Sequence, residues 1–422
     1  MSRKFIKLNK KFTLDYELHK KRKKIQFCKK CVISNQRPRI IFDKNGVCSA
    51  CNYVLEKEKI DWDKRERELQ ALCKKFRSRN GNYDVIVPGS GGKDSAYVAH
   101  LLKEKYNMHP LCVTWAPFEY TNIGLQNFKD FKDAGFDNLS FYHDGNIHRK
   151  LSLMGFDLVA DNFLPFVHGQ KAYAFHLSIK FNIPLMFYGE CGPVEYGGSI
   201  KAKNKPYESI EDWDKNYHKG VNIDKLLKYA VEYGYLSKNE IKNKSLDFYR
   251  APKINEINRV GCQMHWMSYY KKWVPQENYY YAVKHTGFIP KIGRSESTYS
   301  RYASLDDTTD GVHWLLGYIK FGLGRASSDA AHEIRDGHLT RDEGISLVEQ
   351  FDNEMPEIDI KRFFLNEAPE ESILELIRLS EPNRLENTVF VFPEGVLSNI
   401  YLQDLKNFSF LFSENFSEKH KI

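Results

Sequence analysis

The chain has little that would anchor it in a membrane or direct it out of the cell. Across its 422 residues, no apolar run approaches the roughly 18 residues that a membrane span requires. The basic amino-terminal stretch MSRKFIKLNKKF contains neither the apolar centre nor the cleavage site of a signal peptide. Internal repeats and long low-complexity tracts are also missing. We therefore expect a folded cytoplasmic protein with no membrane partner.

A net positive charge is confined to the first 30 residues. The net charge is +8, but residues 1–30 hold twelve Lys or Arg and two acids, so residues 31–422 carry a net charge of −2. A face that binds RNA or DNA would be basic. We therefore do not expect the folded body to bind nucleic acid. The basic leader is either a solvated arm or an arm that binds RNA or acidic partners.

Cysteine is also sparse, and half of the eight cysteines lie close together. Cys28 and Cys31 form one C-x-x-C pair, and Cys48 and Cys51 form a second pair sixteen residues later. Two such pairs supply the tetrahedral set of four thiolates that Zn²⁺ prefers, with no position left open for water. The spacing therefore predicts a structural zinc knuckle, with an iron–sulfur cluster as the alternative.

Short apolar runs alternate with helical patterns from Tyr83 onward. The runs are YDVIVPG (83–89), PLCVTWA (110–116), NLSFYHD (138–144) and IPLMFYGE (183–190), and helical patterns between them cover residues 95–106, 125–134 and 170–181. This alternation is typical of an α/β fold in which helices cover both faces of a parallel, doubly wound sheet. The sequence predicts that fold for the centre of the chain.

Composition divides the rest of the sequence into further segments. The predicted segments are a basic leader (1–26), a four-cysteine zinc knuckle (27–55), a linker helix (56–82), the α/β core (83–198), an insertion or lid (199–260), a mostly helical substrate-binding region (261–355) and a small α/β appendage with TVFVFPEG as a strand (356–422).

A glycine-rich loop separates the first predicted strand from its helix. In VPGSGGKDS, Lys93 is followed by Asp94, so the loop is not a P-loop of the form G-x-x-x-x-G-K-[ST], and its glycines do not have the G-x-G-x-x-G spacing. Glycines still allow backbone N–H groups to surround an anion at a helix amino terminus. We expect Lys93 to neutralise phosphate, Asp94 to ligate Mg²⁺ or order the turn, and Ser95 to cap the helix.

The SGGKDS loop resembles the pyrophosphate loop, or PP-loop, of the ATP pyrophosphatase superfamily. Those enzymes cleave ATP between its α- and β-phosphates and adenylate a carbonyl-type oxygen. The resemblance implies an adenine-nucleotide alpha-hydrolase-like sheet for residues 83–198. Two PP-loop families also carry a four-cysteine knuckle: the tRNA thiolases and the N-acetyl sugar amidotransferases of surface-polysaccharide, flagellin-sugar and nonulosonic acid biosynthesis.

The resemblance to the N-acetyl sugar amidotransferases is the longer of the two, spanning roughly residues 27–350. It includes FDKNGVCSAC, the SGGKDS loop, NFLPFVHGQKAYAFHLSIKFNIPLMFYGE, VEYGG, MSYYKKWVPQENY and YSRYASLDDTTDGVHWLLGYIKFGLGRASSDAAHEIRDGHLTRDE. It implies an ATP-dependent enzyme that adenylates the acetamido oxygen of an N-acetyl sugar, which we expect to be nucleotide-activated. Ammonia then displaces AMP and leaves an acetamidino group. Cys191 departs from the family, which more often has Asn at this position.

The resemblance also implies cofactors, partners and an alternative. ATP, Mg²⁺ and a structural Zn²⁺ are expected, and a separate glutaminase subunit with an ammonia-channelling partner is expected to supply ammonia. A tRNA thiolase remains the alternative, in which Cys112, Cys191 or Cys262 would relay sulfur. The slightly acidic body argues against that alternative.

The expected site residues fall into three groups. For pyrophosphate they are Ser90, Gly91, Gly92, Lys93, Asp94 and Ser95, and for catalysis they are Lys93, Asp94 and Glu190, the last of which follows a strand at the sheet edge where ligands bind. For the substrate they are Gln170, Lys171, Glu195, Tyr196, Asp307, Lys320, Arg325 and Asp329. We expect Gln170 and Lys171 at the start of a helix, and Lys320 and Arg325 at the phosphates of the sugar nucleotide or ATP. An internal salt-bridge ladder is the other interpretation of the charges around Arg325.

Overall fold

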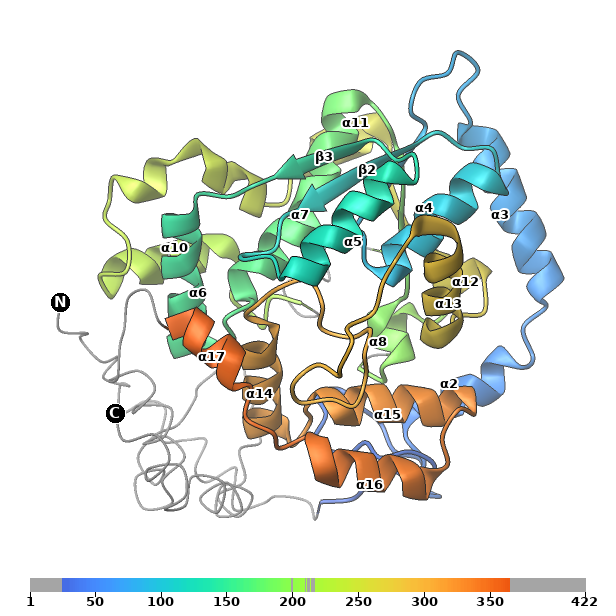
Figure 1. Ribbon diagram of the computed structural model, residues 1–422. Helices are drawn as coiled ribbons and strands as arrows, with labels where there is room; N and C mark the ends of the chain where they lie inside the picture. The colour runs from blue at the N-terminus through green and yellow to red at the C-terminus, as the bar shows by residue number, and fades with distance from the viewer. Residues whose placement is uncertain (1–24, 199, 209, 211–212, 214–216, 365–422) are drawn as a thin grey trace.

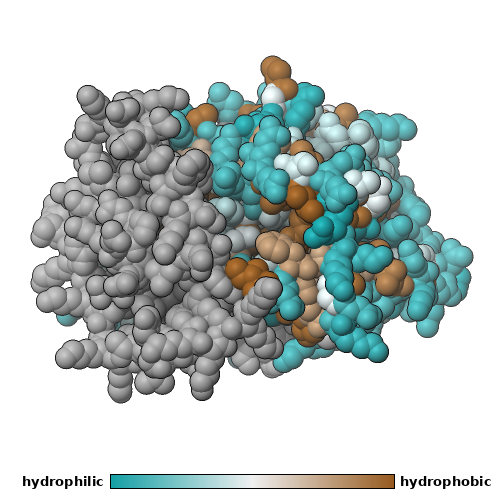
Figure 2. Space-filling model, turned by 90° about the horizontal axis from the view of Figure 1, so that it is seen from below, coloured by the Kyte–Doolittle hydropathy of each residue, from teal (hydrophilic) through white to brown (hydrophobic). Residues whose placement is uncertain are grey.

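The computed structural model describes residues 25–198, 200–208, 210, 213 and 217–364. The basic leader up to residue 24 and the predicted strand TVFVFPEG lie outside the described residues. None of the described helices is long and apolar enough to cross a membrane. Seen from below, the described surface is mostly hydrophilic, with apolar residues gathered in small groups (Figure 2).

A five-stranded parallel sheet forms the centre of the molecule. Its strands are β1 (Val85–Pro88), β2 (Pro110–Trp115), β3 (Asn138–Phe141), β4 (Leu185–Tyr188) and β5 (Gln263–Trp266). Their order is β3-β2-β1-β4-β5, and every pair is parallel. The chain thus winds outward in both directions from β1, and this confirms the predicted α/β class. The strand β5 was not predicted, and it extends the sheet into the region expected to be mostly helical.

Helices surround this sheet and continue beyond it. In chain order the described α-helices are α2 (Ser49–Lys57), α3 (Trp62–Phe76), α4 (Lys93–Glu104), α5 (Asn122–Asp133), α6 (Gly145–Val159), α7 (Leu164–Phe181), α8 (Gly192–Glu195), α10 (Ile223–Glu232), α11 (Ile254–Val260), α12 (Met267–Tyr270), α13 (Pro275–Thr286), α14 (Asp310–Phe321), α15 (Arg325–Asp336), α16 (Arg341–Phe351) and α17 (Glu357–Phe364), and the short 3-10 helices are η2 (Ile200–Ala202), η4 (Glu240–Lys242) and η5 (Lys244–Tyr249).

Alternate residues of the strands enter two separate cores. Val85 and Val87 of β1 point into a core with α3, α4, α12 and α13, whereas Ile86 points into a core with α6, α7 and α10. This alternation follows from the two-residue period of a strand. Figure 1 shows the two groups of helices on opposite faces of the sheet. The sheet is therefore covered on both sides, as the hydrophobic runs predicted.

The described residues between 200 and 260 pack against the α/β core. Their apolar side chains, among them Leu226, Leu246 and Ile257, belong to the same core as α6 and α7. The α10 helix packs on α6, and η5 packs on α7. The described part of the segment predicted as a lid is therefore a structural layer of the α/β core.

The carboxyl-terminal helices pack against the cysteine knuckle. Ala330 and Ala331 of α15 join Cys28, Cys31 and their neighbours in one buried cluster. Arg341, at the start of α16, donates from Nε to the carbonyl oxygens of Cys28 and Cys31, both at 3.3 Å. In Figure 1, α15 and α16 lie side by side at the base of the molecule with the knuckle next to them. Residues some 300 positions apart are thus held in one unit.

Close packing of α7 on β2 gives a test of this core. A Cβ atom at Gly169 would lie 2.1 Å from the Trp115 indole, whereas a Cβ atom at Gly145 would meet nothing within 4 Å. Gly169→Ala should lower the free energy of unfolding by about 1–3 kcal/mol, because the buried indole has to move. Gly145→Ala, the matched control at the start of α6, should leave it almost unchanged. Urea denaturation of both variants measures the difference, and equal stabilities would contradict this packing.

Candidate active site and metal centre

The four cysteines of the knuckle form a compact, buried cluster. Their sulfur atoms all lie within 4.8 Å of one another. Cys28 Sγ is 3.8 Å from Cys51 Sγ, and Cys31 Sγ is 3.7 Å from Cys48 Sγ. A tetrahedral zinc site with Zn–S bonds of about 2.3 Å places its sulfur atoms about 3.8 Å apart. The cluster therefore fits a single zinc ion held by four thiolates.

Backbone amides support the same interpretation. The N–H groups of Lys30 and Cys48 donate to Cys28 Sγ, both at 3.3 Å. Such bonds stabilise a thiolate that ligates a metal. Because the four sulfur atoms already surround one centre, no position remains for water or substrate, so a zinc ion here would be structural.

The glycine loop joins β1 to α4 at the carboxyl edge of the sheet. The α4 helix begins at Lys93, with Gly92 at the N-cap and no side chain capping its first turn. The prediction that Ser95 caps this helix is wrong, because the helix starts earlier and Ser95 Oγ donates to the Gly92 carbonyl oxygen at 3.0 Å. The first amides of α4 are therefore free to bind an anion.

Two of the loop glycines are required by their surroundings. Gly91 has a positive φ of 84°, and a Cβ atom there would lie 2.9 Å from the Cα atom of Phe128 on α5. At Gly89, a Cβ atom would lie 2.1 Å from the Cβ atom of Ser95. Larger residues at either position would therefore displace the loop from its packing against α5 and the first turn of α4.

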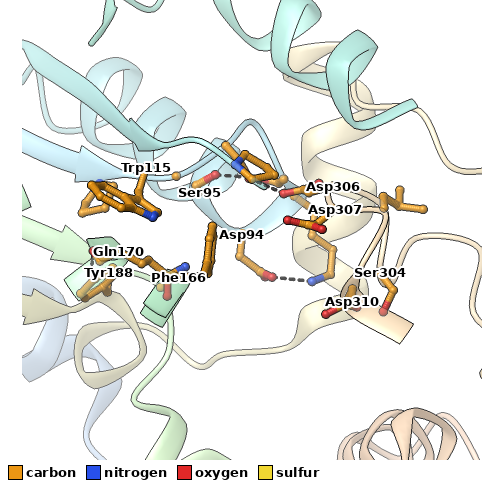
Figure 3. A pocket seen from close by; sticks show the side chains of 18 of the residues that line it. Asp94, Ser95, Trp115, Phe166, Gln170, Tyr188, Ser304, Asp306, Asp307 and Asp310 are labelled. Carbon is orange, nitrogen blue, oxygen red and sulfur yellow. Dashed lines mark hydrogen bonds and ion pairs between the residues drawn. The ribbon is translucent and has the colours of Figure 1, made fainter. Parts of the chain in front are cut away.

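A chamber of about 400 Å³ opens in front of this loop. It lies where the strand order reverses between β1 and β4, the place where open α/β sheets bind ligands. Figure 3 shows Trp115, Phe166 and Tyr188 with Gln170 on one side of this first chamber, and Asp306, Asp307 and Asp310 on the other. The chamber thus pairs an aromatic wall, on which a flat ring can stack, with an acidic wall.

Several carboxyl groups of the first chamber have a pKa that is raised towards neutral pH. Burial raises the pKa of Glu190 to about 7, and the neighbouring charge of Asp94 adds to the shift. Burial also raises the pKa of Asp306 to about 6 and that of Asp307 to about 7. Ser90 donates to Asp306, and Lys93 pairs with Asp94. These groups can therefore change protonation state near neutral pH or accept a cation.

A second chamber of about 300 Å³ adjoins the first. Lys93, Glu190, Tyr302 and Arg325 line both chambers and form the junction between them. The α15 helix contributes the largest share of the remaining wall, and the lining includes Arg37, Tyr196, Gln276, Trp314, Ser328, Asp329, His332, Glu333 and Asp336. The loop that would hold phosphates thus faces the helices expected to hold the substrate.

The structure brings most of the predicted residues to these two chambers. Those that line them are Ser90, Gly92, Lys93, Asp94, Ser95, Gln170, Glu190, Tyr196, Asp307, Arg325 and Asp329. Arg325 pairs with Asp329 at 3.2 Å along one face of α15, as their spacing predicted. Part of the alternative salt-bridge ladder is therefore present within the site itself.

Lys171 and Glu195, two charged residues predicted to bind the substrate, do not line either chamber. Lys171 pairs with Glu208 at 3.2 Å, and Glu195 pairs with Lys57 at 2.8 Å, with all four side chains buried. Gln170 and Lys171 also lie in the middle of α7, not at the start of a helix as predicted. Both buried pairs are satisfied within the protein, and none of their four residues lines either chamber.

Lys320 also lies away from the site. Its Nζ atom donates to the carbonyl oxygen of Val159 at 3.3 Å, and its side chain is 2% exposed. Burial lowers its pKa to about 7. The structure therefore does not place Lys320 where it could hold phosphate in either chamber.

Several residues that line the site were not predicted from the sequence. Arg37 comes from the loop between the two cysteine pairs, and Trp115 and Phe166 resemble ordinary core residues in their surroundings. Asp306 also lines the first chamber and was not among the predicted site residues. Only the position of Trp115, at the carboxyl end of a strand, could have indicated it.

The carboxyl-terminal part of the chain resembles a known family. Residues 296–373 match the model of a family described as "LPS biosynthesis protein WbpG-like, C-terminal domain". This stretch is therefore similar to a domain of an LPS biosynthesis protein. The matched stretch contributes Arg325, Asp329 and most of the second chamber, so the resemblance includes the proposed substrate side of the site.

One curated relative matches a fifth of the chain. A protein of Methanocaldococcus jannaschii described as "Uncharacterized protein MJ1599" is 33% identical over 87 residues. These residues are 20% of this chain and 31% of the relative, so the chain spans about a third of the length of the curated relative that it matches.

Metal analysis tests the knuckle. Purified protein should contain about one zinc per chain, and a chelator should lower its melting temperature until zinc is restored. Cys48→Ser should abolish zinc binding, because it removes one of the four ligands. Cys73→Ser, which changes a buried cysteine of α3 outside the cluster, is the matched control and should keep its zinc. Iron in place of zinc, or full zinc in Cys48→Ser, would contradict this assignment.

Proposed function

We propose that the protein is an ATP-dependent amidotransferase that acts on an N-acetyl sugar. It would adenylate the acetamido oxygen, release pyrophosphate, and replace AMP by ammonia to give an acetamidino group. The observation that carries this proposal is the junction of the two chambers. There an uncapped helix terminus with Lys93 faces a chamber built from the segment that resembles an LPS biosynthesis domain.

The first chamber suits ATP as a substrate. Its aromatic wall, with Trp115 and Tyr188, offers rings on which adenine can stack. The free amides at the start of α4 and the Lys93 side chain are placed to offset the negative charge of a triphosphate. Cleavage between the α- and β-phosphates would leave pyrophosphate in the glycine loop and AMP on the sugar.

The acidic wall suits Mg²⁺. Asp94, Asp306 and Asp310 present carboxylate oxygens to the same chamber, and such oxygens are the ligands that Mg²⁺ prefers. Bound there, Mg²⁺ would offset the negative charge of the phosphates. The carboxylates would otherwise repel ATP, so their presence beside an anion-binding loop favours a metal-dependent nucleotide site.

Glu190 is placed to move a proton. It lines both chambers and therefore lies where the acetamido group and the α-phosphate would meet. With a pKa raised to about 7, its carboxylate can accept a proton from the attacking ammonia. Tyr196 donates to Glu190 Oε1 at 3.4 Å and helps to orient it.

Ammonia would reach the site from outside this chain. We propose a partner glutaminase subunit with an ammonia-channelling protein as the source. Cys191, a thiol that could suggest a glutaminase nucleophile, is buried and its pKa is raised to about 12 by burial. It lines neither chamber among the described residues.

The tRNA thiolase alternative finds no support. Burial raises the pKa of Cys112, Cys191 and Cys262, which disfavours the reactive thiolate. None of these three cysteines lines either chamber in the described part of the chain. The family match points to sugar biosynthesis instead.

The first test measures the reaction and its phosphate-binding lysine. With ATP, Mg²⁺, ammonium and a panel of N-acetyl sugars, the wild type should form AMP, pyrophosphate and an acetamidino sugar visible by mass spectrometry. Lys93→Met should slow AMP formation by about 10²–10³-fold, because it removes a charge that offsets the transition state. Lys103→Met, on the same helix but bonded to the Gly135 carbonyl, should leave the rate unchanged. No AMP with any sugar would refute the proposal.

The second test concerns the pH dependence. The fraction of Glu190 that can accept a proton grows as the pH rises through about 7. At a constant concentration of free ammonia, the wild-type rate should therefore rise across this range. Glu190→Gln should be about 10²–10⁴-fold slower and lack the inflection. Glu104→Gln, at the exposed end of α4, should keep the wild-type profile. An unchanged profile in Glu190→Gln would show that Glu190 is not the base.

A further inference from the structure

Arg37 is the residue of the cysteine knuckle that lines the second chamber among the described residues. This residue lies between the two cysteine pairs and lines the chamber opposite the carboxyl-terminal helices. Its Nε atom has no hydrogen-bond partner, and no described residue forms an ion pair with its guanidinium. A second arginine, Arg335 of α15, lies close enough for its charge to add to the burial that lowers the pKa of Arg37 to about 10.

The unpaired groups near this part of the chamber are mostly donors. Arg335 Nη1 lacks a partner, and so does Nε2 of His332, a chamber residue that is only 5% exposed. Two neighbouring guanidinium groups without a carboxylate are costly to bury. Such an arrangement is stabilised when an anion binds between them.

The acids of the chamber do not supply that anion. Asp329 is bonded to Arg325 and Thr298, Glu333 accepts from Tyr299 and Tyr302, and Asp336 accepts from His332. Each acid therefore already has a partner other than Arg37. Glu190, the remaining acid of the lining, accepts from Tyr196, so none of the chamber's acids is hydrogen-bonded to Arg37.

We propose that Arg37 binds an anionic oxygen group of the sugar substrate, either a phosphate or a carboxylate. This inference rests on the proposed function, because it places the acetamido end of the sugar at the junction with Lys93 and Glu190. The anionic end then extends into the second chamber, where the planar fork of a guanidinium can hold two oxygens at once. The knuckle is thus part of the substrate site as well as a structural module.

The knuckle is held firmly enough to position Arg37. A Cβ atom at Gly197 would lie 3.4 Å from Ile40 Cδ1, and one at Gly322 would lie 3.1 Å from Gln36 Oε1. These close approaches tie the loop around Arg37 to the segment after α8 and to the end of α14. Metal loss should therefore weaken binding of an anionic sugar more than binding of ATP.

Calorimetric titration with three sugars tests the proposal. The probes are neutral N-acetylglucosamine, its anomeric phosphate and its uronic acid. The wild type should bind one of the two charged sugars at least about tenfold more tightly than the neutral sugar, because charged hydrogen bonds of this kind are strong. The phosphate and uronic acid arms show which group the site takes.

Variants of the knuckle complete the experiment. Arg37→Gln should abolish the preference for the charged sugar, and Arg37→Lys, which keeps the charge but loses the fork, should reduce it. Lys44→Gln removes an exposed positive charge from the same knuckle and should retain the preference. Zinc content and ATP binding should stay unchanged in all three.

Two results would overturn the proposal. One is a wild type without a preference for either charged sugar, and the other is an Arg37→Gln protein that keeps the preference. Formation of AMP, measured separately, distinguishes this inference from the proposed function. A preference without AMP formation would refute only the proposed function, whereas AMP formation without a preference would refute only the role of Arg37.

Discussion

Backbone atoms of α5 lie so close to Gly91 that a methyl group there would come within 2.9 Å of the Phe128 Cα atom. This contact fixes the loop between β1 and α4, so the first amides of α4 point into the first chamber without a capping side chain. Ser90 extends the arrangement by donating to Asp306, which comes from a segment 216 residues later. The position of this glycine loop therefore also sets the position of the acidic wall.

The second chamber depends on a different long-range contact. The α15 and α16 helices pack on the cysteine knuckle, and both sides of that contact contribute to the chamber wall. A knuckle of this size cannot bury a core of its own, so a bound metal would replace that core and hold its loop in place. The metal centre and the proposed substrate site are then physically linked, although the four cysteines touch no substrate.

Local patterns were sufficient for four of the five strands, because strand and helix periods are properties of neighbouring residues. The four runs from Tyr83 became β1 to β4, whereas β5 (Gln263–Trp266) lies in an aromatic stretch and was missed. Charged residues were harder to assign. Glu195 forms a buried structural ion pair with Lys57, 138 positions away. No local pattern in the sequence could reveal that partner. Arg37 was missed for the same reason, because only the folded chain brings it to α15.

The central claim is that the acetamido oxygen attacks the α-phosphate of ATP. An N-acetyl sugar carrying a heavy oxygen isotope in its acetamido group tests this claim most directly. The account predicts that, after reaction with ATP and ammonia, mass spectrometry finds the label in the phosphate of AMP. Label that remains in the sugar, or that appears in inorganic phosphate with ADP as the product, would contradict it.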